Sequence, residues 1–475
     1  MSDKNTSAVD ELVGQPPAEK KSKTKSTKSS SKSNKTSKTT KKAKSSRSKS
    51  AKKSRSSKKR SNHKNQQSRR SNHRNNQHSN KKNHHNNHNS RLEQMPDADL
   101  PTETVTGVLD TSRDGHGVLR VKFSEDERDA YISTSQMRRF RLRPGDLITG
   151  PARRPKDNER YWGLLMLEKV NGQAAEKFSQ EKRPKFKSLT PVYPDKKIKL
   201  ETGQEPLDLR IIDLIAPIGK GQRSLLVSPP KAGKTTLLKH IATGVAQNEP
   251  EAHLMAVLVG ERPEEVTDIK RHIAKITKDQ GEVAASNFDE SAEDQCRVAE
   301  LALERAKRLV ELGQDVVILL DSITRLARAY NLAMPTSGRT LSGGFDPAAL
   351  FPPKRFFGAA RNFEVPGSLT IIGTALVDTG SRMDDLIYEE FKGTGNQEVH
   401  LDRRLAERRI YPAIDVRRSG TRRDDLLIDS VTYQSISTLH RMLDTFNDDE
   451  RTQTLINQLQ RTKSNKEFLA GLKEG

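Results

Sequence analysis

The strongest constraint on the fold is a buried strand that leads through a Gly-Lys-Thr loop into an apolar helix. The strand is Ser224–Ser228, and the loop reads Pro-Pro-Lys-Ala-Gly-Lys-Thr-Thr. Backbone N–H groups at such a turn can cradle phosphates, while Lys234 reaches the β- and γ-phosphates and the Thr235 hydroxyl ligates Mg²⁺. The candidate nucleotide-binding residues here are Pro230, Lys231, Ala232, Gly233, Lys234, Thr235 and Thr236.

Ser228 departs from this motif, because it stands where the first glycine is usual. A chance Gly-Lys-Thr sequence in an ordinary loop is therefore the alternative interpretation. The order strand, loop and helix favours the phosphate site, since that is the setting in which the motif functions.

Strands and helices alternate along residues 205–475. Continuous apolar runs at Leu254–Val259, Val316–Leu320 and Leu369–Leu376 are typical of strands buried on both faces. The segment Ser291–Gly313 has a helical spacing of apolar residues, a possible capping box at its start and a glycine stop. The pattern predicts a parallel α/β sheet for this part of the chain.

Two predicted strands end in carboxylates. Asp321 follows Val316–Leu320, at the sheet edge where α/β proteins bind ligands, and is a candidate for holding Mg²⁺ through water. Its alternative role is to cap the following helix. Glu261 follows Leu254–Val259 and is well placed to polarise an attacking water. We prefer it to Glu264 and Glu265, which fall on the start of a helix.

Residues 101–172 carry a different pattern, of short apolar stretches separated by turn signals. This spacing predicts a small β-barrel of the OB type, followed by a polar linker at 173–204. The predicted strands are Thr104–Asp110, Gly117–Phe123, Ala130–Ile132, Asp146–Gly150 and Tyr161–Lys169.

Residues 1–100 form a separate compositional region. Residues 1–90 hold 26 Lys and Arg against four Asp and Glu, so that this region carries +22 of the net charge of +23. Such a segment buries too little apolar surface to fold, and we expect a disordered tail that attracts nucleic acid through counterion release. The alternative is a tail that only aids solubility.

Cysteine usage and hydropathy indicate the cellular compartment of the protein. Cys296 is the only cysteine, so no internal disulfide can form, and its helical position favours a packing role. No apolar run approaches the roughly 18 residues of a membrane span. We expect a cytoplasmic protein with no membrane partner.

Taken together, the motifs resemble the Rho family of bacterial transcription termination factors. The similarity runs from about Thr104 to the C-terminus, with the motifs in family order. The matching segments are 229–235 (PPKAGKT), 261–266 (ERPEEV), 321–331 (DSITRLARAYN), 353–362 (PKRFFGAARN), 378–381 (DTGS), 388–396 (YEEFKGTGN) and 419–422 (SGTR).

The resemblance implies a RecA-like ATPase in a homohexameric ring. It further implies ATP and Mg²⁺ as cofactors, and an RNA-dependent ATPase with 5′-3′ RNA–DNA helicase activity. Single-stranded RNA and the RNA polymerase elongation complex are the implied partners, and an elongation factor of the NusG type is a further candidate. In this reading Glu261 activates water, Arg262 links hydrolysis to the neighbouring subunit, and Arg422 and Arg409 act between subunits. Tyr411 stacks on adenine, the alternative being a core tyrosine.

The resemblance also assigns RNA-binding residues. Segments 337–344 and 379–383 would meet RNA in the ring channel, where Arg382 replaces the family's usual lysine. In the barrel, His116 and Val118 stand where the family typically has phenylalanines, which predicts a weaker or altered base preference. The implied RNA-binding residues are Tyr131, Arg139, Glu159, Arg160, Tyr161, Arg339, Thr340, Ser342, Gly343, Gly380 and Arg382.

Two other functions compete with a terminating RNA translocase. One is a related hexameric ATPase that acts on polypeptide, such as an export motor; the barrel and the glycine-rich channel segments argue against it. The other is an RNA-packaging protein with a degenerate ATPase. The tail favours this reading, but the set Lys234, Thr235, Glu261, Asp321 and Arg422 is intact.

Overall fold

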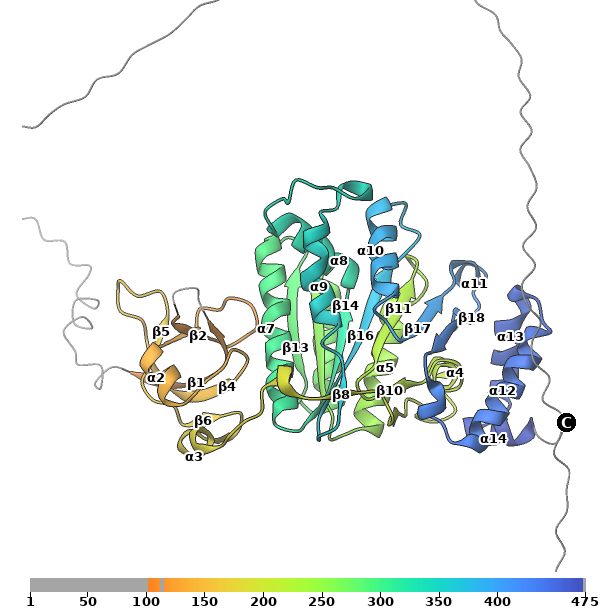
Figure 1. Ribbon diagram of the computed structural model, residues 1–475, viewed down its shortest axis with the longest axis horizontal. Helices are drawn as coiled ribbons and strands as arrows, with labels where there is room; N and C mark the ends of the chain where they lie inside the picture. Colours follow the sequence, from red (N-terminus) through yellow and green to blue (C-terminus); the bar gives the residue numbers. More distant parts are fainter. Residues whose placement is uncertain (1–100, 112–114, 473–475) are drawn as a thin grey trace, which may run out of the picture. The chain divides into compact units, whose positions relative to one another are not determined.

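The computed structural model describes residues 101–111 and 115–472 of the 475-residue chain. The predicted tail at residues 1–100 lies outside the described residues, as do 112–114 and 473–475. Within the described part, a small β-barrel comes first and a larger α/β domain follows (Figure 1). This order of fold classes confirms the prediction.

The first part of the described chain is a closed barrel. Its elements are β1 (Thr102–Thr111), β2 (Gly117–Arg120), β3 (Ala130–Ile132), α2 (Thr134–Arg139), β4 (Leu147–Arg153), β5 (Trp162–Leu164), β6 (Lys169–Val170) and β7 (Gln173–Ala174). Strand β1 pairs with both β2 and β4, and this closes the circuit β1-β2-β3-β5-β4. Alternate side chains, including Leu109, Ile132 and Trp162, fill the interior.

The strand predicted at Tyr161–Lys169 is interrupted in the structure. Strand β5 ends at Leu164 and β6 begins at Lys169. Between them the chain passes close over Gly150, where an added Cβ would lie 2.0 Å from the carbonyl oxygen of Met166. The absence of a side chain at Gly150 permits this approach, and the ladder breaks there.

The segment 173–204, predicted as a linker, carries short elements of its own. Phe178 and Phe186 are buried and fix this segment to the neighbouring structure. Strand β8 pairs with β15 and β9 pairs with β10. The elements of the segment are α3 (Ala175–Gln180), η2 (Phe186–Ser188), β8 (Pro191–Val192) and β9 (Lys197–Ile198). The partner strands β10 (Ile218–Gly219) and β15 (Asn362–Phe363) come later in the chain.

The α/β domain is built on a sheet in the order β13-β12-β14-β16-β11-β17-β18. Its strands are β11 (Arg223–Ser228), β12 (His253–Glu261), β13 (Glu282–Asn287), β14 (Asp315–Asp321), β16 (Ser368–Leu376), β17 (Gln397–Leu401) and β18 (Ile414–Thr421). Neighbouring strands are parallel except for β18, which is antiparallel to β17. The predicted parallel sheet therefore has one antiparallel edge.

Helices cover both faces of this sheet (Figure 1). The helices of the domain are α4 (Leu207–Ile215), α5 (Lys234–Asn248), α6 (Pro263–Thr277), α7 (Ala292–Glu311), α8 (Ile323–Ala333), η3 (Ser342–Gly344), η4 (Pro347–Leu350), α9 (Phe351–Phe357), α10 (Arg382–Lys392), α11 (Arg403–Glu407), η5 (Asp424–Leu426), α12 (Ser430–Asp444), α13 (Asp448–Gln460) and α14 (Asn465–Gly471). Leu226 packs with α4, α5 and α6, whereas its neighbours Leu225 and Val227 pack with α7, α8 and α10.

Helix α7 shows how well local signals set its ends. The Ser291 hydroxyl oxygen accepts a hydrogen bond from the backbone N–H of Asp294, as an N-cap does. In a full capping box the Asp294 side chain would accept from the backbone N–H of Ser291. Here the Asp294 carboxylate accepts from the Ser291 hydroxyl instead, at 2.7 Å. Cys296 is buried in the core, and burial raises the pKa of its thiol to about 12. The thiol therefore has the predicted packing role.

The barrel packs against α7 through polar contacts. Arg143 pairs with Glu311 at 2.7 Å, and Arg297 pairs with Asp110 at 2.6 Å. Gly145 lies directly against the backbone of α7, where a Cβ would come within 2.3 Å of the carbonyl carbon of Glu304. These contacts attach the barrel to a helix of the α/β core.

Candidate active site and nucleic-acid interface

The Gly-Lys-Thr loop lies between β11 and α5, as the sequence predicts. Strand β11 ends at Ser228, and α5 begins at Lys234 after the N-cap Gly233, which has φ +98°. The first turn of α5 presents unpaired backbone N–H groups and the positive end of the helix dipole. Pro230 and Lys231 are exposed, whereas Ala232 is buried beneath the loop. The loop is therefore built to receive an anion.

Lys234 lies between the two carboxylates selected from the sequence. Its Nζ atom is 2.6 Å from Oδ1 of Asp321 and 3.3 Å from Oε1 of Glu261. These acids end the adjacent strands β14 and β12. Burial lowers the pKa of Lys234, but the two carboxylates outweigh it and the pKa is raised. The cluster thus holds a cation beside two anions at one edge of the sheet.

Glu261 is almost fully buried at 2% exposure. Burial, together with the negative charge of Asp321, raises its pKa, which Lys234 and Arg325 partly oppose. The Nε atom of Arg325 lies 3.1 Å from Oε1 of Glu261, and its Nη1 donates to the carbonyl of Gly260 at 2.6 Å. A carboxyl group with a raised pKa in a restricted geometry suits proton abstraction from water.

Asp321 has one oxygen that its protein neighbours leave open. The Thr374 hydroxyl donates to Oδ1 at 2.7 Å, and Lys234 contacts the same atom. Oδ2 is buried and has no hydrogen-bond partner among the described residues. An unsatisfied carboxylate oxygen in the Lys234 cluster fits a hydrated Mg²⁺ ion, because hard cations take oxygen ligands.

A pocket of about 340 Å³ adjoins the loop. Ala232, Gly233 and Thr236 form one side, and Tyr411 lines it with 51% of its surface exposed. This exposure excludes the alternative of a core tyrosine. The pocket also contains residues that the motifs did not indicate: Glu205, Pro206, Leu207, Asp208, Leu237, His240, Leu401, Pro412, Ala413 and Gln460.

Arg422, the predicted arginine finger, lies apart from the Lys234 cluster. Thr421 at the end of β18 pairs with Gln397 at the start of β17, because the two strands are antiparallel. Arg422 therefore lies at the amino-terminal edge of the parallel strands, whereas Lys234 lies at the carboxyl-terminal edge. Arg422 and Arg409 are both exposed. Arg262 is also exposed and lies 3.6 Å from Glu265.

The barrel has a pocket of about 280 Å³. It is lined by Tyr131, Arg153, Glu159, Arg160, Tyr161, Trp162 and Gly163. Sequence reasoning indicated four of these residues but missed Arg153, Trp162 and Gly163. Arg153 holds Glu159 through two hydrogen bonds, of 2.5 and 2.7 Å, and these bonds lower the pKa of Glu159 to about 2. The permanent carboxylate can accept hydrogen bonds from a base edge.

Aromatic groups gather at one side of this pocket. The rings of His116 and Tyr131 have centroids 5.5 Å apart, and the Arg160 guanidinium lies 5.2 Å from the Tyr161 ring centroid. Val118 pairs with Tyr131 across the ladder and is buried. The imidazole thus extends the aromatic surface that Tyr131 offers. The weaker base preference predicted from His116 and Val118 stays a prediction. Arg139 lies at the end of α2, over the Phe140 ring.

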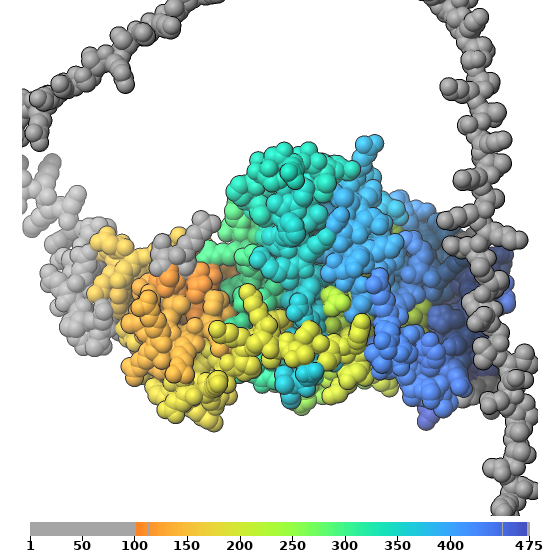
Figure 2. All heavy atoms as spheres, in the orientation of Figure 1, coloured from red at the N-terminus to blue at the C-terminus, as the bar shows by residue number. Residues whose placement is uncertain are grey.

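The two segments predicted to line a ring channel lie side by side (Figure 2). A Cβ at Gly343 would be 2.7 Å from the backbone nitrogen of Met383, so only glycine allows this approach without displacement. The first segment is exposed from Ser337 to Gly344, and Arg382 is exposed at the start of α10. The structure therefore joins the glycine-rich loop and Arg382 in one surface. Gly380, Arg339, Thr340 and Ser342 belong to these segments.

Two family models cover most of the described residues. Residues 105–176 match the model for the Rho termination factor RNA-binding domain. Residues 208–421 match the model for the nucleotide-binding domain of the ATP synthase alpha/beta family. The first match coincides with the barrel, and the second with the α/β domain. The barrel is therefore an RNA-binding domain and the sheet a nucleotide-binding domain.

Curated relatives are similar over about three quarters of this chain. The transcription termination factor Rho of Bacillus subtilis is 57% identical over 365 residues, which cover 76% of this chain and 83% of the relative. The factor of Chromobacterium violaceum is 52% identical over 373 residues, covering 77% and 87%. That of Streptomyces lividans is 54% identical over 369 residues, covering 77% and 51%.

Solved structures show the same fold at much lower identity. An ATPase from the type III secretion system of pathogenic bacteria has a TM-score of 0.51 at 23% identity, covering 60% of this chain and 86% of the other. The ATP synthase subunit NeqB of Nanoarcheaum equitans has a TM-score of 0.50 at 15% identity, covering 60% and 76%. At these identities the likeness concerns the fold alone.

Fold and site together define an RNA-dependent ATPase, in which a RecA-like nucleotide-binding domain follows an RNA-binding barrel. The relatives specify this class further. The chain belongs to the transcription termination factor Rho family. It is an ATP-dependent RNA translocase that terminates transcription. None of the helices in the described residues is long and apolar enough to cross a bilayer.

Proposed function

We propose specific roles for the residues at the carboxyl-terminal edge of the sheet. Lys231, Lys234 and the loop amides bind the triphosphate of ATP, and Thr235 and Asp321 hold Mg²⁺, which neutralises charge on the phosphates. Glu261 orients the attacking water and accepts its proton. The close approach of Lys234, Glu261 and Asp321 supports these roles, because the groups come from three separate strand ends.

The chain completes its site only in a ring. Arg422 lies at the opposite edge of the sheet from Lys234, so a phosphate bound at Lys234 is beyond its reach within one chain. An arginine of a neighbouring copy can meet that phosphate in a cyclic assembly. Arg422 then acts as the finger, Arg409 as a second inter-subunit arginine, and Arg262 as the link from Glu261 to the neighbour. We infer a homohexamer, as in the family resemblance.

In this proposal RNA binds at two sites. The barrel pocket around Tyr131, Glu159 and Tyr161 captures single-stranded RNA. The surface that joins Gly343 and Arg382 contacts RNA in the ring channel and moves with hydrolysis. The RNA polymerase elongation complex is the target, in the cytoplasm, with an elongation factor of the NusG type as an auxiliary partner.

Subunit mixing tests the shared site. Lys234→Ala and Arg422→Ala should each lose RNA-stimulated ATPase activity as pure rings. Random mixed rings place an intact Lys234 opposite an intact Arg422 at about a quarter of the interfaces. Activity should therefore return on mixing after subunit exchange. Mixtures that remain inactive, although mass spectrometry shows mixed rings, would contradict a site shared between subunits.

A further inference from the structure

The pocket beside Tyr411 contains a buried acid that none of the motifs reveals. Most of its walls are apolar, with Leu237, Leu401 and Pro412 beside the exposed ring of Tyr411, as suits a planar base. Two acids also line it. Glu205 is exposed, whereas Asp208 is only 6% exposed. A buried carboxylate requires hydrogen-bond donors, and one that keeps spare acceptor sites can also bind a donor group of a ligand.

Asp208 is held in place by the helix that follows the phosphate loop. Its Oδ2 atom lies 2.5 Å from Nδ1 of His240 on α5, and its Oδ1 accepts from the backbone N–H of Leu209 at 2.8 Å. Each carboxylate oxygen has two acceptor sites, so both oxygens keep capacity for a further donor. His240 also lines the pocket. The pair thus connects the wall of the pocket to the phosphate-binding helix.

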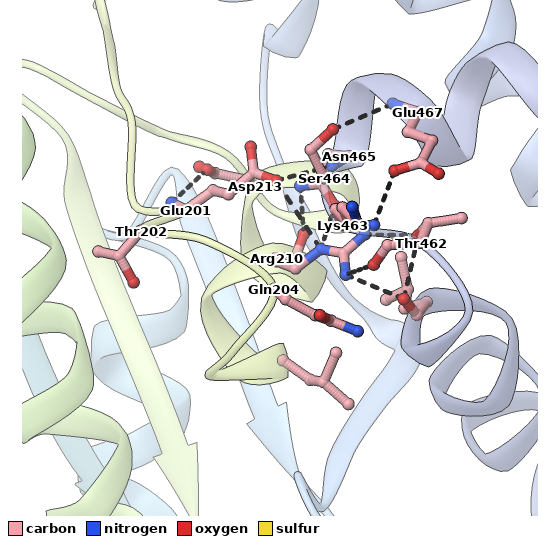
Figure 3. A network of polar contacts seen from close by, with 12 residues as sticks. Glu201, Thr202, Gln204, Arg210, Asp213, Thr462, Lys463, Ser464, Asn465 and Glu467 are labelled. Atoms are coloured by element: carbon pink, nitrogen blue, oxygen red, sulfur yellow. Dashed lines mark hydrogen bonds and ion pairs between the residues drawn. The ribbon is translucent and has the colours of Figure 1, made fainter.

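The first turn of α4, which carries Asp208, is also held by the polar contacts of Arg210 (Figure 3). Arg210 is completely buried, and its guanidinium donates to the carbonyls of Leu459 at 2.9 Å and Thr462 at 2.8 Å. Asn465 accepts from Nε of Arg210 and donates to its backbone carbonyl at 3.0 Å. The turn between α13 and α14 therefore holds α4 rigidly, and with it the position of Asp208.

The chemistry of the bases then determines what Asp208 can read. The 6-amino group is the hydrogen-bond donor of adenine, whereas guanine presents a carbonyl oxygen at the same position. A carboxylate accepts from the amine and repels the carbonyl. We propose that Asp208, oriented by His240, accepts a hydrogen bond from the 6-amino group of adenine and so sets the base preference of the ATPase site. This rests on the proposed placement of ATP between the phosphate loop and Tyr411.

Purine riboside triphosphate tests this contact, because it differs from ATP only in lacking the 6-amino group. RNA-stimulated hydrolysis of both nucleotides is measured on the whole ring. A single hydrogen bond to a charged group predicts that kcat/KM for ATP exceeds that for the analogue by roughly tenfold to a hundredfold. In Asp208→Ala this ratio should fall close to one, while kcat/KM for the analogue is kept.

His240 is a positioning residue, and its variants provide an independent readout. His240→Ala should lower the ATP-to-analogue ratio, and His240→Gln, which retains a donor for the Asp208 carboxylate, should restore most of it. If Asp208→Ala fails to assemble into a ring, the comparison of His240→Ala with His240→Gln tests the proposal by itself. Asp268→Ala serves as the matched control, because it removes an exposed acid that pairs with Lys239, the residue before His240.

The outcomes separate base reading from the site itself. An unchanged ratio in Asp208→Ala, or an equal loss with both nucleotides, overturns the proposal, because it shows no contact or only a structural role. An ATP-to-analogue ratio that does not change in His240→Ala also overturns the proposal. If Lys234→Ala hydrolyses both nucleotides normally, the proposed placement of the nucleotide is wrong. A Lys234→Ala ring that is inactive, with an unchanged ratio in Asp208→Ala, rejects only the role of Asp208.

Discussion

The Nζ atom of Lys234 lies 2.6 Å from Oδ1 of Asp321, although 87 residues separate them in the chain. Lys234 begins the helix after β11, and Asp321 ends β14, two strands away in the sheet. Glu261 reaches the same ammonium from β12. Three strand ends thus concentrate one cation and two carboxylates where a triphosphate and its metal are to be held.

Glu261→Gln should remove water activation without removing nucleotide binding. The amide keeps the size of the side chain but cannot take up a proton, so we expect kcat to fall by about 10² to 10⁴. The Kd for ATP should change little, since Lys234 and the loop remain. Steady-state hydrolysis and equilibrium binding measure the two effects. Glu264→Gln, on the exposed first turn of α6, is the control and should retain full activity.

Glu159 should remain ionised far into the acid range. The Arg153 hydrogen bonds lower its pKa to about 2, from an ordinary value of 4.5. The pair's contribution to stability is therefore present above about pH 4.5 and is lost as the pH falls through about 2. Carboxyl NMR titration should place the midpoint near this lower value. In Arg153→Gln the midpoint should return towards 4.5; a midpoint unchanged by that substitution would contradict the assigned cause.

His116→Phe should tighten the binding of oligocytidylate to the barrel. A phenyl ring next to Tyr131 offers a better stacking surface than an imidazole, and stacking contributes on the order of 1–3 kcal/mol per base. The gain is expected at up to about tenfold in Kd, because a ring is already present at this position. In a Tyr131→Ala background the gain should shrink, since the two rings act together. An undiminished gain there would show that His116 acts elsewhere.

Arg210→Met should loosen the C-terminal helices. The substitution leaves the carbonyls of Leu459 and Thr462 without their buried donor, at a cost of about 2–5 kcal/mol in local stability. Hydrogen exchange of the backbone amides in α13 and α14 should accelerate in proportion to this loss of local stability. Arg441→Met is the control, because Arg441 is exposed and, among the described residues, hydrogen-bonds only Thr438. Equal exchange rates in both variants would show that the Arg210 hydrogen bonds do not stabilise α13 and α14.

Removal of residues 21–90 should weaken RNA binding and reduce its salt dependence. This segment contains no Asp or Glu among its Lys and Arg residues. Each phosphate contact that is lost lowers the slope of log Kobs against log salt by about 0.7 for single strands. Filter binding at several salt concentrations measures the slope. An unchanged affinity and slope would leave the tail without a role in gripping RNA.

Local sequence was enough to predict those features that depend on a single segment of the chain. The strand–loop–helix around Lys234 and the N-cap at Ser291 were predicted, since each depends on neighbours a few residues apart. Asp321 and Glu261 could be chosen because both end buried strands. The break after β5 was missed, since it depends on the close approach of Met166 to Gly150 from another strand.

The sequence alone determined the two fold classes, the phosphate loop and the acids that face it, because periodicity and turn chemistry are local properties. Tertiary structure decided which of these groups meet. The order of strands places Lys234 beside Asp321, and the antiparallel pairing of β18 carries Arg422 to the opposite edge. The packing of α4 brings Asp208 to His240. Such contacts join distant segments, and their energies depend on the arrangement of the whole sheet, which local spacing does not encode.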